Sequence, residues 1–236
     1  MHVKKEDEKE KKGLIFLTFH QLKAPISDIK LSLEMLLDGS FGKINEGQRD
    51  IVEKSRKKTV TLIYLLNDLL SMASLNEERY GHKTSVDIEE LVKCVMDGRE
   101  NEIKRKKIDL EFKKPESGLP KVMVNREKMF IAIQNLFDNA IKYTPPLGKI
   151  SVCLEDGGGE IKMKIQDSGM GIPQSEQKKL FTKFFRAENA AKIDNMGSGL
   201  GLFITKEIVE NHNGKIWFES KENEGSSFFI SLPVPR

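Results

Sequence analysis

The chain has 236 residues, of which 38% are hydrophobic and 32% charged, and its formal net charge is +3. This apolar content suffices for one or two modest cores, and the near balance of charge excludes an electrostatic nucleic-acid binder. The two cysteines, Cys94 and Cys153, lack metal-ligand spacing and indicate reduced thiols. Because no apolar run approaches the roughly 20 residues of a membrane helix, we expect a soluble cytoplasmic chain. The inner part of a longer membrane-anchored protein would look the same.

The first part of the chain predicts two long helices. After a mixed charge run at Met1–Lys12, apolar residues recur at four-three spacing from Ile15 to Leu36, which is typical of a coiled-coil seam. Two glycines in Asp38–Gly42 interrupt the pattern, and a second seam predicts a helix from about Asn45 to Leu75. Together they predict an antiparallel hairpin. A single hairpin cannot bury stripes of this width, so we expect a homodimeric four-helix bundle.

His20 lies one residue after the seam position Phe19 and is therefore expected to face outward from the first helix. Pro25 falls inside the same helix, where it removes the hydrogen bond to the carbonyl of Gln21 at a cost of roughly 3 kcal/mol. A lone histidine is most often an ordinary side chain. A costly bend just after an exposed imidazole favours a functional site.

The polar, glycine-containing stretch Arg79–Ser85 predicts a linker, which separates a domain at residues 1–78 from one at 86–236. The second domain is expected to begin with a helix at Asp87–Lys107, capped by Asp87. Its basic end, Lys104–Lys107, complements the helix dipole. Short strands are expected at Ile108–Phe112 and Val122–Val124. The side chains expected to face inward from the helix are Ile88, Leu91, Val92, Val95 and Ile103.

Ala132–Thr144 predicts a helix with one buried side, and the prolines after Thr144 end it. Asn135, Asn139 and Lys142 emerge from the other side as one polar column. Amide oxygens beside a lysine suit a magnesium ion that carries nucleotide phosphates. On this stretch alone, a solvated helix face is an equal alternative. The buried side is expected to hold Ile133, Leu136, Phe137, Ala140 and Ile141.

Ile150–Leu154 and Ile161–Ile165 alternate apolar and polar residues around Gly157–Gly159, which predicts a β-hairpin with one buried face. The second strand leads into Asp167-Ser-Gly169-Met-Gly171. A carboxylate fixed at a strand end could accept a hydrogen bond from an adenine amino group, while the glycines let the backbone approach the base. An ordinary turn is the alternative.

Phe181–Arg186 groups aromatic residues and places Arg186 as a candidate contact of the γ-phosphate, with a surface arginine as the alternative. The next segment, Ala187–Met196, has no clear period and is interpreted as a mobile lid. Gly197–Gly201 then opens a helix at Leu202–Asn211, whose first N–H groups suit phosphates. This loop neither follows a strand nor ends as a P-loop does.

Two further strands, Gly214–Ser220 and Ser226–Leu232, complete a two-layer α/β sandwich with helices on one face of a mixed sheet. Trp217 is expected in its core. The predicted fold class is α+β, a long helical hairpin followed by this sandwich.

The seven residues Phe19-His-Gln-Leu-Lys-Ala-Pro25 resemble the phosphoacceptor box of two-component sensor histidine kinases. The Asn helix, the Asp-x-Gly-x-Gly turn, the aromatic box and the Gly-x-Gly-x-Gly loop also occur in the order and at the spacing of the catalytic domains of that family. Those domains are ATPase-like and of the GHKL type. The resemblance covers essentially Leu14–Pro235.

The resemblance implies a protein-histidine kinase in which His20 takes the γ-phosphoryl group of ATP and passes it to an aspartate on a response regulator receiver domain. A neutral imidazole is nucleophilic near pH 7, which suits this role. Because the chain begins abruptly in a helix, we also expect a sensor domain upstream of it. ATP with Mg²⁺ would lie in one pocket, and Asn139, with Asn135, would bind the metal. The residues implied for the pocket are Asn135, Asn139, Lys142, Tyr143, Asp167, Gly169, Gly171, Arg186, Gly197, Ser198, Gly199, Leu200 and Gly201.

Two positions depart from the family pattern. Gln21 stands where Glu or Asp is usual, and it orients the imidazole of His20 without taking up a proton. Because a positioned base typically contributes about 10²–10⁴-fold, slow autophosphorylation is expected. Ala24 stands where Thr or Asn usually orients water, so weak phosphatase activity toward the regulator is expected.

Two other functions compete with the kinase. GHKL ATP hydrolases, such as the gyrase, MutL and heat-shock chaperone ATPases, carry a glutamate base one turn before the metal-binding asparagine. Asn135 occupies that place and cannot deprotonate water, which disfavours hydrolysis. The second alternative is a degenerate kinase that binds nucleotide and acts as a scaffold, because of Gln21 and Ala24.

Overall fold

The computed structural model describes residues 2–74, 82–193 and 197–235, with the backbone only at 2–17, 19, 20, 73 and 74. The chain divides into two compact units. One is a helical hairpin within the first 77 residues, and the other is an α/β unit that contains most of the remaining chain. Among the described residues, no helix has the length and apolar character to cross a membrane.

The hairpin consists of α1 (His2–Asp38) and α2 (Glu46–Ser74), which pack along each other as predicted. Pro25 lies inside α1 without ending it. The two glycines of the connecting loop, Gly39 and Gly42, have positive φ angles of 86° and 103°. Asn45 and Gln48 exchange side chain to backbone hydrogen bonds of 2.9 and 3.0 Å, a reciprocal cap that fixes where α2 begins.

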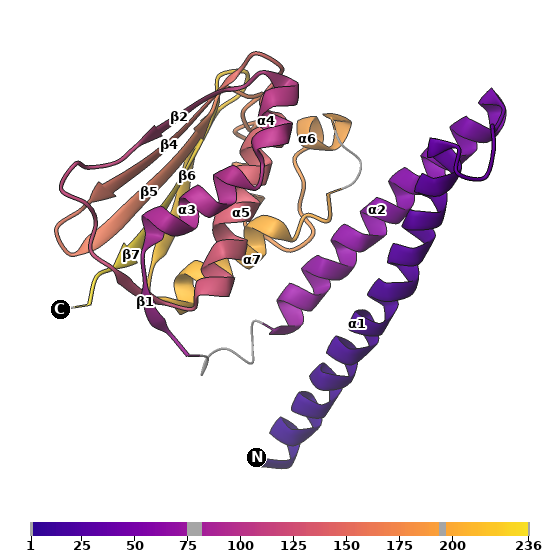
Figure 1. Ribbon diagram of the computed structural model, residues 1–236. Helices are drawn as coiled ribbons and strands as arrows, with labels where there is room; N and C mark the ends of the chain where they lie inside the picture. Colours follow the sequence, from indigo (N-terminus) through magenta and orange to yellow (C-terminus); the bar gives the residue numbers. More distant parts are fainter. Residues whose placement is uncertain (1, 75–81, 194–196, 236) are drawn as a thin grey trace. The chain divides into compact units, whose positions relative to one another are not determined.

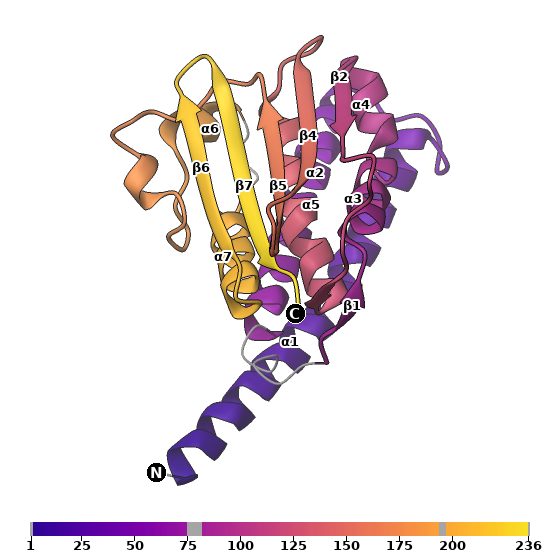
Figure 2. The ribbon, with the colours of Figure 1, turned by 90° about the vertical axis from the view of Figure 1, so that its left-hand side faces the viewer.

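The α/β unit is built on a five-stranded mixed sheet in the order β2-β4-β5-β7-β6, in which only the β2–β4 pair is parallel. Helices α3, α5 and α7 cover one face of this sheet (Figures 1 and 2), as expected. The strands are β2 (Asp109–Lys113), β4 (Lys149–Asp156), β5 (Glu160–Asp167), β6 (Lys215–Lys221) and β7 (Gly225–Pro233). The helices are α3 (Ile88–Asp97), α4 (Glu100–Lys106), α5 (Arg126–Tyr143), α6 (Glu188–Ile193) and α7 (Gly201–Asn211), with a short 3-10 helix η2 (Gln177–Lys179).

The single helix predicted at Asp87–Lys107 is two helices, α3 and α4, and this prediction was wrong. Gly98 ends α3, where its N–H bonds back to the carbonyls of Cys94 and Met96. Arg99 then turns its guanidinium to Asp138 of α5 and makes a bidentate pair, with Nε–Oδ1 2.5 Å and Nη2–Oδ2 2.9 Å. A tertiary ion pair thus lies at the two-residue break between α3 and α4. The predicted cap is confirmed, since Asp87 accepts from the N–H groups of the first turn, and the five side chains predicted to face inward are buried.

Trp217 was predicted in the core, and this too was wrong. It is 36% exposed and stacks on Phe229 with ring centroids 5.1 Å apart. The period of two along edge strand β6 puts Phe218 on the helix-covered side and Trp217 on the opposite, open side of the sheet. Nζ of Lys164, on the neighbouring strand β5, lies 5.7 Å from the centroid of the Phe229 ring on the same face of the sheet.

The chain enters the α/β unit through β1 (Thr84–Val86), which pairs antiparallel with β3 (Val122–Val124). The predicted linker, Arg79–Ser85, therefore ends inside a strand, and its first three residues lie outside the described part of the chain.

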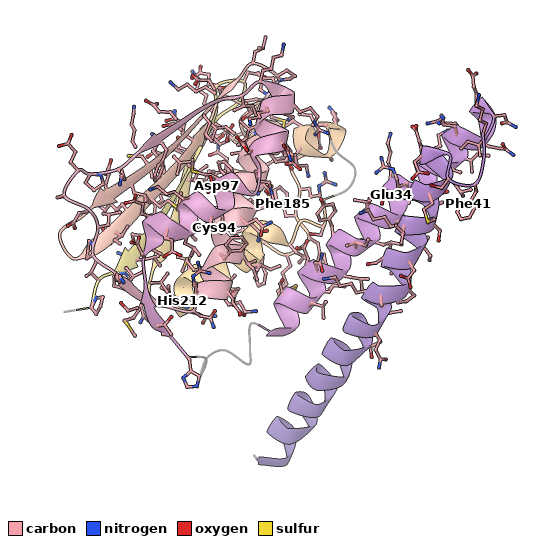
Figure 3. All side chains as sticks on the ribbon, in the orientation of Figure 1. Glu34, Phe41, Cys94, Asp97, Phe185 and His212 are labelled. Carbon is pink, nitrogen blue, oxygen red and sulfur yellow. The ribbon has the colours of Figure 1, made fainter. Side chains whose placement is uncertain are left out.

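His212 lies at the end of the unit that contains β1 and β3 (Figure 3), where it links the C-terminal end of α7 to the start of α5. Its Nδ1 donates to the carbonyl of Ile208 at 2.7 Å, and its Nε2 accepts from the backbone N–H of Asn125 at 2.9 Å. Both bonds require a neutral ring with the proton on Nδ1. Burial lowers the pKa of this imidazole, which favours the same form. Lys83 donates to the last carbonyl of α7, that of Asn211, at 3.1 Å.

The turn after β5 gives a test of local packing, because Gly171 and Gly158 have similar φ angles of 64° and 71°. A Cβ at Gly171 would lie 2.0 Å from the carbonyl oxygen of Lys221, whereas one at Gly158 would meet nothing within 4 Å. Gly158→Ala should therefore cost only the strain of a left-handed residue, about 1–2 kcal/mol. Gly171→Ala should lower the free energy of unfolding by about 1–3 kcal/mol more. Urea unfolding followed by fluorescence of Trp217 measures both, and equal losses would contradict the predicted clash.

Candidate nucleotide-binding site

Helix α5 supplies one wall of the candidate site. Asn125 caps its first turn by accepting from the N–H of Lys128 at 3.0 Å, and the predicted apolar side is buried in full. Asn135, Asn139 and Lys142 lie half-buried on the other side, and Tyr143 is the last residue of the helix. The polar column expected from the sequence is therefore present.

Lys106 of α4 holds the C-terminal end of α5. Its Nζ donates to the carbonyls of Ile141 at 2.7 Å, Lys142 at 3.0 Å and Thr144 at 2.9 Å. The basic run lies in the last turn of α4, as predicted, and the structure shows in addition that Lys106 caps a second helix. Burial lowers the pKa of this amine, with a smaller effect from Arg105. No sequence pattern pairs a lysine with carbonyls about 40 residues later.

The Asp-x-Gly-x-Gly turn lies against this same end of α5. A Cβ at Gly169 would come within 2.7 Å of both the Asp167 carboxylate and the carbonyl oxygen of Tyr143, so only glycine fits there. The Asp167 carboxylate is 7% exposed and accepts from the N–H of Gly169 at 2.8 Å. Burial raises its pKa to about 6, although the amides of Gly169 and Ser226 that donate to it oppose this rise. The turn thus presents a buried acceptor beside bare backbone.

The last three residues of the glycine loop, Gly199–Gly201, lie against both α5 and the aromatic box. Gly199 has a φ of 73°, and its Cβ would lie 2.6 Å from the backbone of Phe184. Leu200 is fully buried, and α7 begins at Gly201 without a side-chain cap. The carbonyl of Gly201 accepts from Nδ2 of Asn135 at 3.2 Å. Gly197 and Ser198 directly follow residues 194–196, which lie outside the described part.

The amide of Asn135 therefore serves a role that the sequence did not predict, because it fastens the polar column of α5 to the first turn of α7. Since Nδ2 faces a carbonyl, Oδ1 points away from it. Among the described residues, no cluster of three His, Cys, Asp or Glu side chains could hold a metal ion. The oxygen donors on the polar side of α5 include the amide oxygens of Asn135 and Asn139, which are neutral hard ligands.

The predicted lid contains a short helix, α6, which sequence periodicity did not reveal. The carboxylate of Glu176 accepts from the N–H of Glu188 at 3.1 and 3.3 Å and so supports the first turn of α6. Arg186 donates to the carbonyl of Ala190 at 3.4 Å. The side chain of Asn189 donates to the carbonyl of Gly171 at 3.0 Å. The first part of this segment is thus bonded to the turn that carries Asp167.

His20 and Gln21 lie in the hairpin unit, within α1. The side chain of Gln21 is exposed, and that of His20 lies outside the described residues.

The observations in the α/β unit fit an adenine nucleotide. A buried carboxylate stands at the end of β5, and glycines keep the backbone bare where a side chain would fill the space. The N-terminal turn of an 11-residue helix begins at the glycine loop, next to the amide column of α5.

Comparison with protein families identifies both units. Residues 19–78 match the His Kinase A (phospho-acceptor) domain, and residues 124–236 match the histidine kinase-, DNA gyrase B- and HSP90-like ATPase. His20 lies within the first match.

Curated relatives agree over almost the whole chain. The chain is 30% identical to the adaptive-response sensory kinase SasA of Synechocystis, over 96% of this chain and 60% of that protein. It is also 30% identical to the sensor protein kinase WalK of Staphylococcus aureus, over 96% of this chain and 54% of that protein. The chain therefore spans a little more than half the length of these relatives.

Solved structures support the same assignment. The catalytic domain of the histidine kinase ThkA matches 66% of the chain and all of its own length at 32% identity, with a TM-score of 0.58. Full-length ShkA, crystallised with AMPPNP, matches 94% of the chain and 45% of its own length with a TM-score of 0.70, and at 22% identity it shows the fold alone. The chain belongs to the sensor histidine kinases and consists of their phosphoacceptor hairpin followed by their ATP-binding catalytic domain.

Proposed function

We propose that this chain phosphorylates itself on His20 with ATP and then transfers the phosphoryl group to an aspartate on the receiver domain of a response regulator. The observation that supports this most strongly is the presence of both family matches on one chain, with a histidine inside the phosphoacceptor match. By the same reasoning we place the chain on the cytoplasmic side, downstream of a sensor domain.

The residues proposed for the pocket would divide the binding of ATP between them. Asp167 would accept from the adenine amino group, and the backbone at Gly169 and Gly171 would lie against the base. The loop Gly197–Gly201 and the first turn of α7 would bind the phosphates. Arg186 would contact the γ-phosphate.

Asn139, with Asn135, would hold Mg²⁺, and Lys142 would add positive charge beside the phosphates. When bound, the metal would neutralise charge that develops on the phosphate oxygens. The capping of α5 by Lys106 supports this assignment, because it fixes the helix end from which Lys142 and Tyr143 project.

His20 would act as the nucleophile. The unprotonated ring nitrogen forms a bond to the γ-phosphorus while the bond from that phosphorus to the β–γ bridging oxygen breaks, and ADP leaves with the electron pair. The other ring nitrogen then gives up its proton. Gln21 can orient the ring through its carbonyl oxygen, but the proton must go to water, which favours a slow reaction.

We also propose a homodimer formed through the hairpin. Four side chains of the predicted seam are between 43% and 65% exposed in the single chain, which leaves an apolar stripe uncovered: Leu22, Ile29, Ile51 and Leu62. A second hairpin would bury them in a four-helix bundle. We expect light scattering at micromolar concentration to give twice the chain mass of 26.9 kDa, and a monomer would contradict this proposal.

Labelled ATP tests the kinase directly. The wild type should acquire an acid-labile, base-stable phosphate, His20→Ala should bind ATP without labelling, and Asn139→Ala should lose both metal-dependent binding and label. Gln21→Glu should raise the rate, by up to about 10²-fold if the carboxylate acts as a base. Label that persists in His20→Ala would refute the assigned acceptor. Steady-state ATP turnover without phosphoprotein would indicate a hydrolase, and binding without either reaction would indicate a scaffold.

The raised pKa of Asp167 predicts how ATP affinity depends on pH. With a pKa of about 6, the carboxylate is mostly ionised at pH 7.5 and mostly protonated at pH 5. If only the ionised form binds adenine, affinity should fall by about tenfold for each pH unit below that pKa. The same shift means that ionisation disfavours the folded state, so this group's contribution to stability decreases as pH rises from 3.8 to about 6.

Calorimetric titration with ATP between pH 5 and 7.5 measures this dependence, with Asp167→Asn as the control. Titration of the phosphates affects both proteins equally, so the ratio of their dissociation constants isolates the carboxylate. A ratio that stays constant over this range would rule out Asp167 as the titrating group.

A further inference from the structure

Asn189 of α6 has a side-chain orientation that the structure determines. Its Nδ2 donates to the backbone carbonyl of Gly171 at 3.0 Å. Because a carbonyl only accepts, the nitrogen of the amide must face Gly171 and the oxygen must face the other way.

The Oδ1 atom of Asn189 is buried and has no hydrogen-bond partner, and no other buried side-chain atom of the described residues is in this situation. Buried polar atoms in native proteins are nearly always bonded, since they lose water without replacement when they are not. The unpaired oxygen of Asn189 therefore requires an explanation. A ligand that donates a hydrogen bond to this oxygen would supply the missing partner.

The surroundings of Asn189 make an accidental orientation a poor explanation. The carboxylate of Glu176 supports the first turn of α6, and Arg186 bonds the carbonyl of Ala190, so α6 is held on both sides of Asn189. Gly171 itself belongs to the turn that carries the buried carboxylate of Asp167. The unmet acceptor is thus one hydrogen bond away from the turn proposed to bind adenine.

We propose that Oδ1 of Asn189 is a nucleotide contact that accepts a hydrogen bond from the nucleoside part of the substrate. This inference rests on the proposed function. At neutral pH, ionised phosphates offer only acceptors, so they repel a second acceptor. The donors of an adenine nucleotide are the exocyclic amino group and the two ribose hydroxyls. Asn189 therefore recognises the base or the sugar, in addition to Asp167.

The contact would also make α6 responsive to the nucleoside. Because Oδ1 is buried, a nucleoside that reaches it must displace some of the atoms that cover it. The hydrogen bond from Nδ2 to the carbonyl of Gly171 is on the opposite side of the amide, so it can persist while Oδ1 bonds the nucleoside. It also fixes the direction in which Oδ1 points. Asn189 would thus act as a specificity residue that links α6 to the turn after β5.

The test combines a variant with nucleotides that each lack one donor. Asn189→Leu has a similar volume and removes the acceptor, and Asn101→Leu makes the same change on the exposed surface of α4. Dissociation constants are measured by calorimetry for ATP, 2′-deoxy-ATP, 3′-deoxy-ATP and N6,N6-dimethyl-ATP. Asn189→Ala provides a second variant if Asn189→Leu folds poorly, and thermal unfolding without nucleotide checks both.

We expect Asn189→Leu to weaken ATP binding by about tenfold and Asn101→Leu to stay within about twofold of the wild type. The analogue that lacks the recognised donor should bind the wild type and Asn189→Leu equally weakly, whereas the other analogues should keep the difference. Equal binding of ATP by wild type and variant, or the same loss for every analogue, would reduce Asn189 to a support of α6 and overturn the inference. A wild type that binds no adenine nucleotide would instead overturn the proposed function.

Discussion

Three backbone carbonyls at the C-terminal end of α5 converge on the ammonium group of Lys106, and the candidate site depends on this contact. The end of a helix carries partial negative charge and unpaired carbonyls, and a single cation neutralises both. Because the amine is partly withdrawn from water, its bonds are stronger than those of a surface lysine. The contact fixes the last turn of α5, and with it the place of Lys142 and Tyr143.

Helix α5 contacts two other parts of the candidate site, the turn after β5 and the start of α7. At its C-terminal end the carbonyl of Tyr143 lies so close to Gly169 that any side chain at that position would collide with it. About two turns before that end, Asn135 bonds the carbonyl of Gly201 and ties α5 to the start of α7. The turn proposed to bind the base and the loop proposed to bind the phosphates therefore both contact the same helix, α5. This explains why residues far apart in sequence keep one geometry.

Sequence patterns were sufficient wherever the determining forces are local. Periods of 3.6 and 2 located the helices and strands of the hairpin and of the sheet, and the glycines marked the turns. They failed where a distant partner decides. The predicted helix is interrupted at Gly98, where the next residue, Arg99, pairs with Asp138 of α5. Lys106 lies in the last turn of α4 as predicted, but its bonds to α5 had no sequence signal. Trp217 lies on the open face of the sheet because the face of an edge strand is set by its register with β7. Asn189 carries no sequence signal, since its role depends on a bond to Gly171.

Helix α7 connects the strand through which the chain enters the α/β unit to the glycine loop. The residues just before and within β1 are fastened to the far end of that helix, directly by Lys83 and, through β3 and Asn125, by His212. The opposite end of α7 begins at the glycine loop, about 16 Å away at 1.5 Å per residue. A helix is stiff along its axis, so a displacement of the residues fastened to the C-terminal end of α7 reaches its first turn with little loss. Helix α7 is thus a rigid connection between the strand through which the chain enters the α/β unit and the glycine loop.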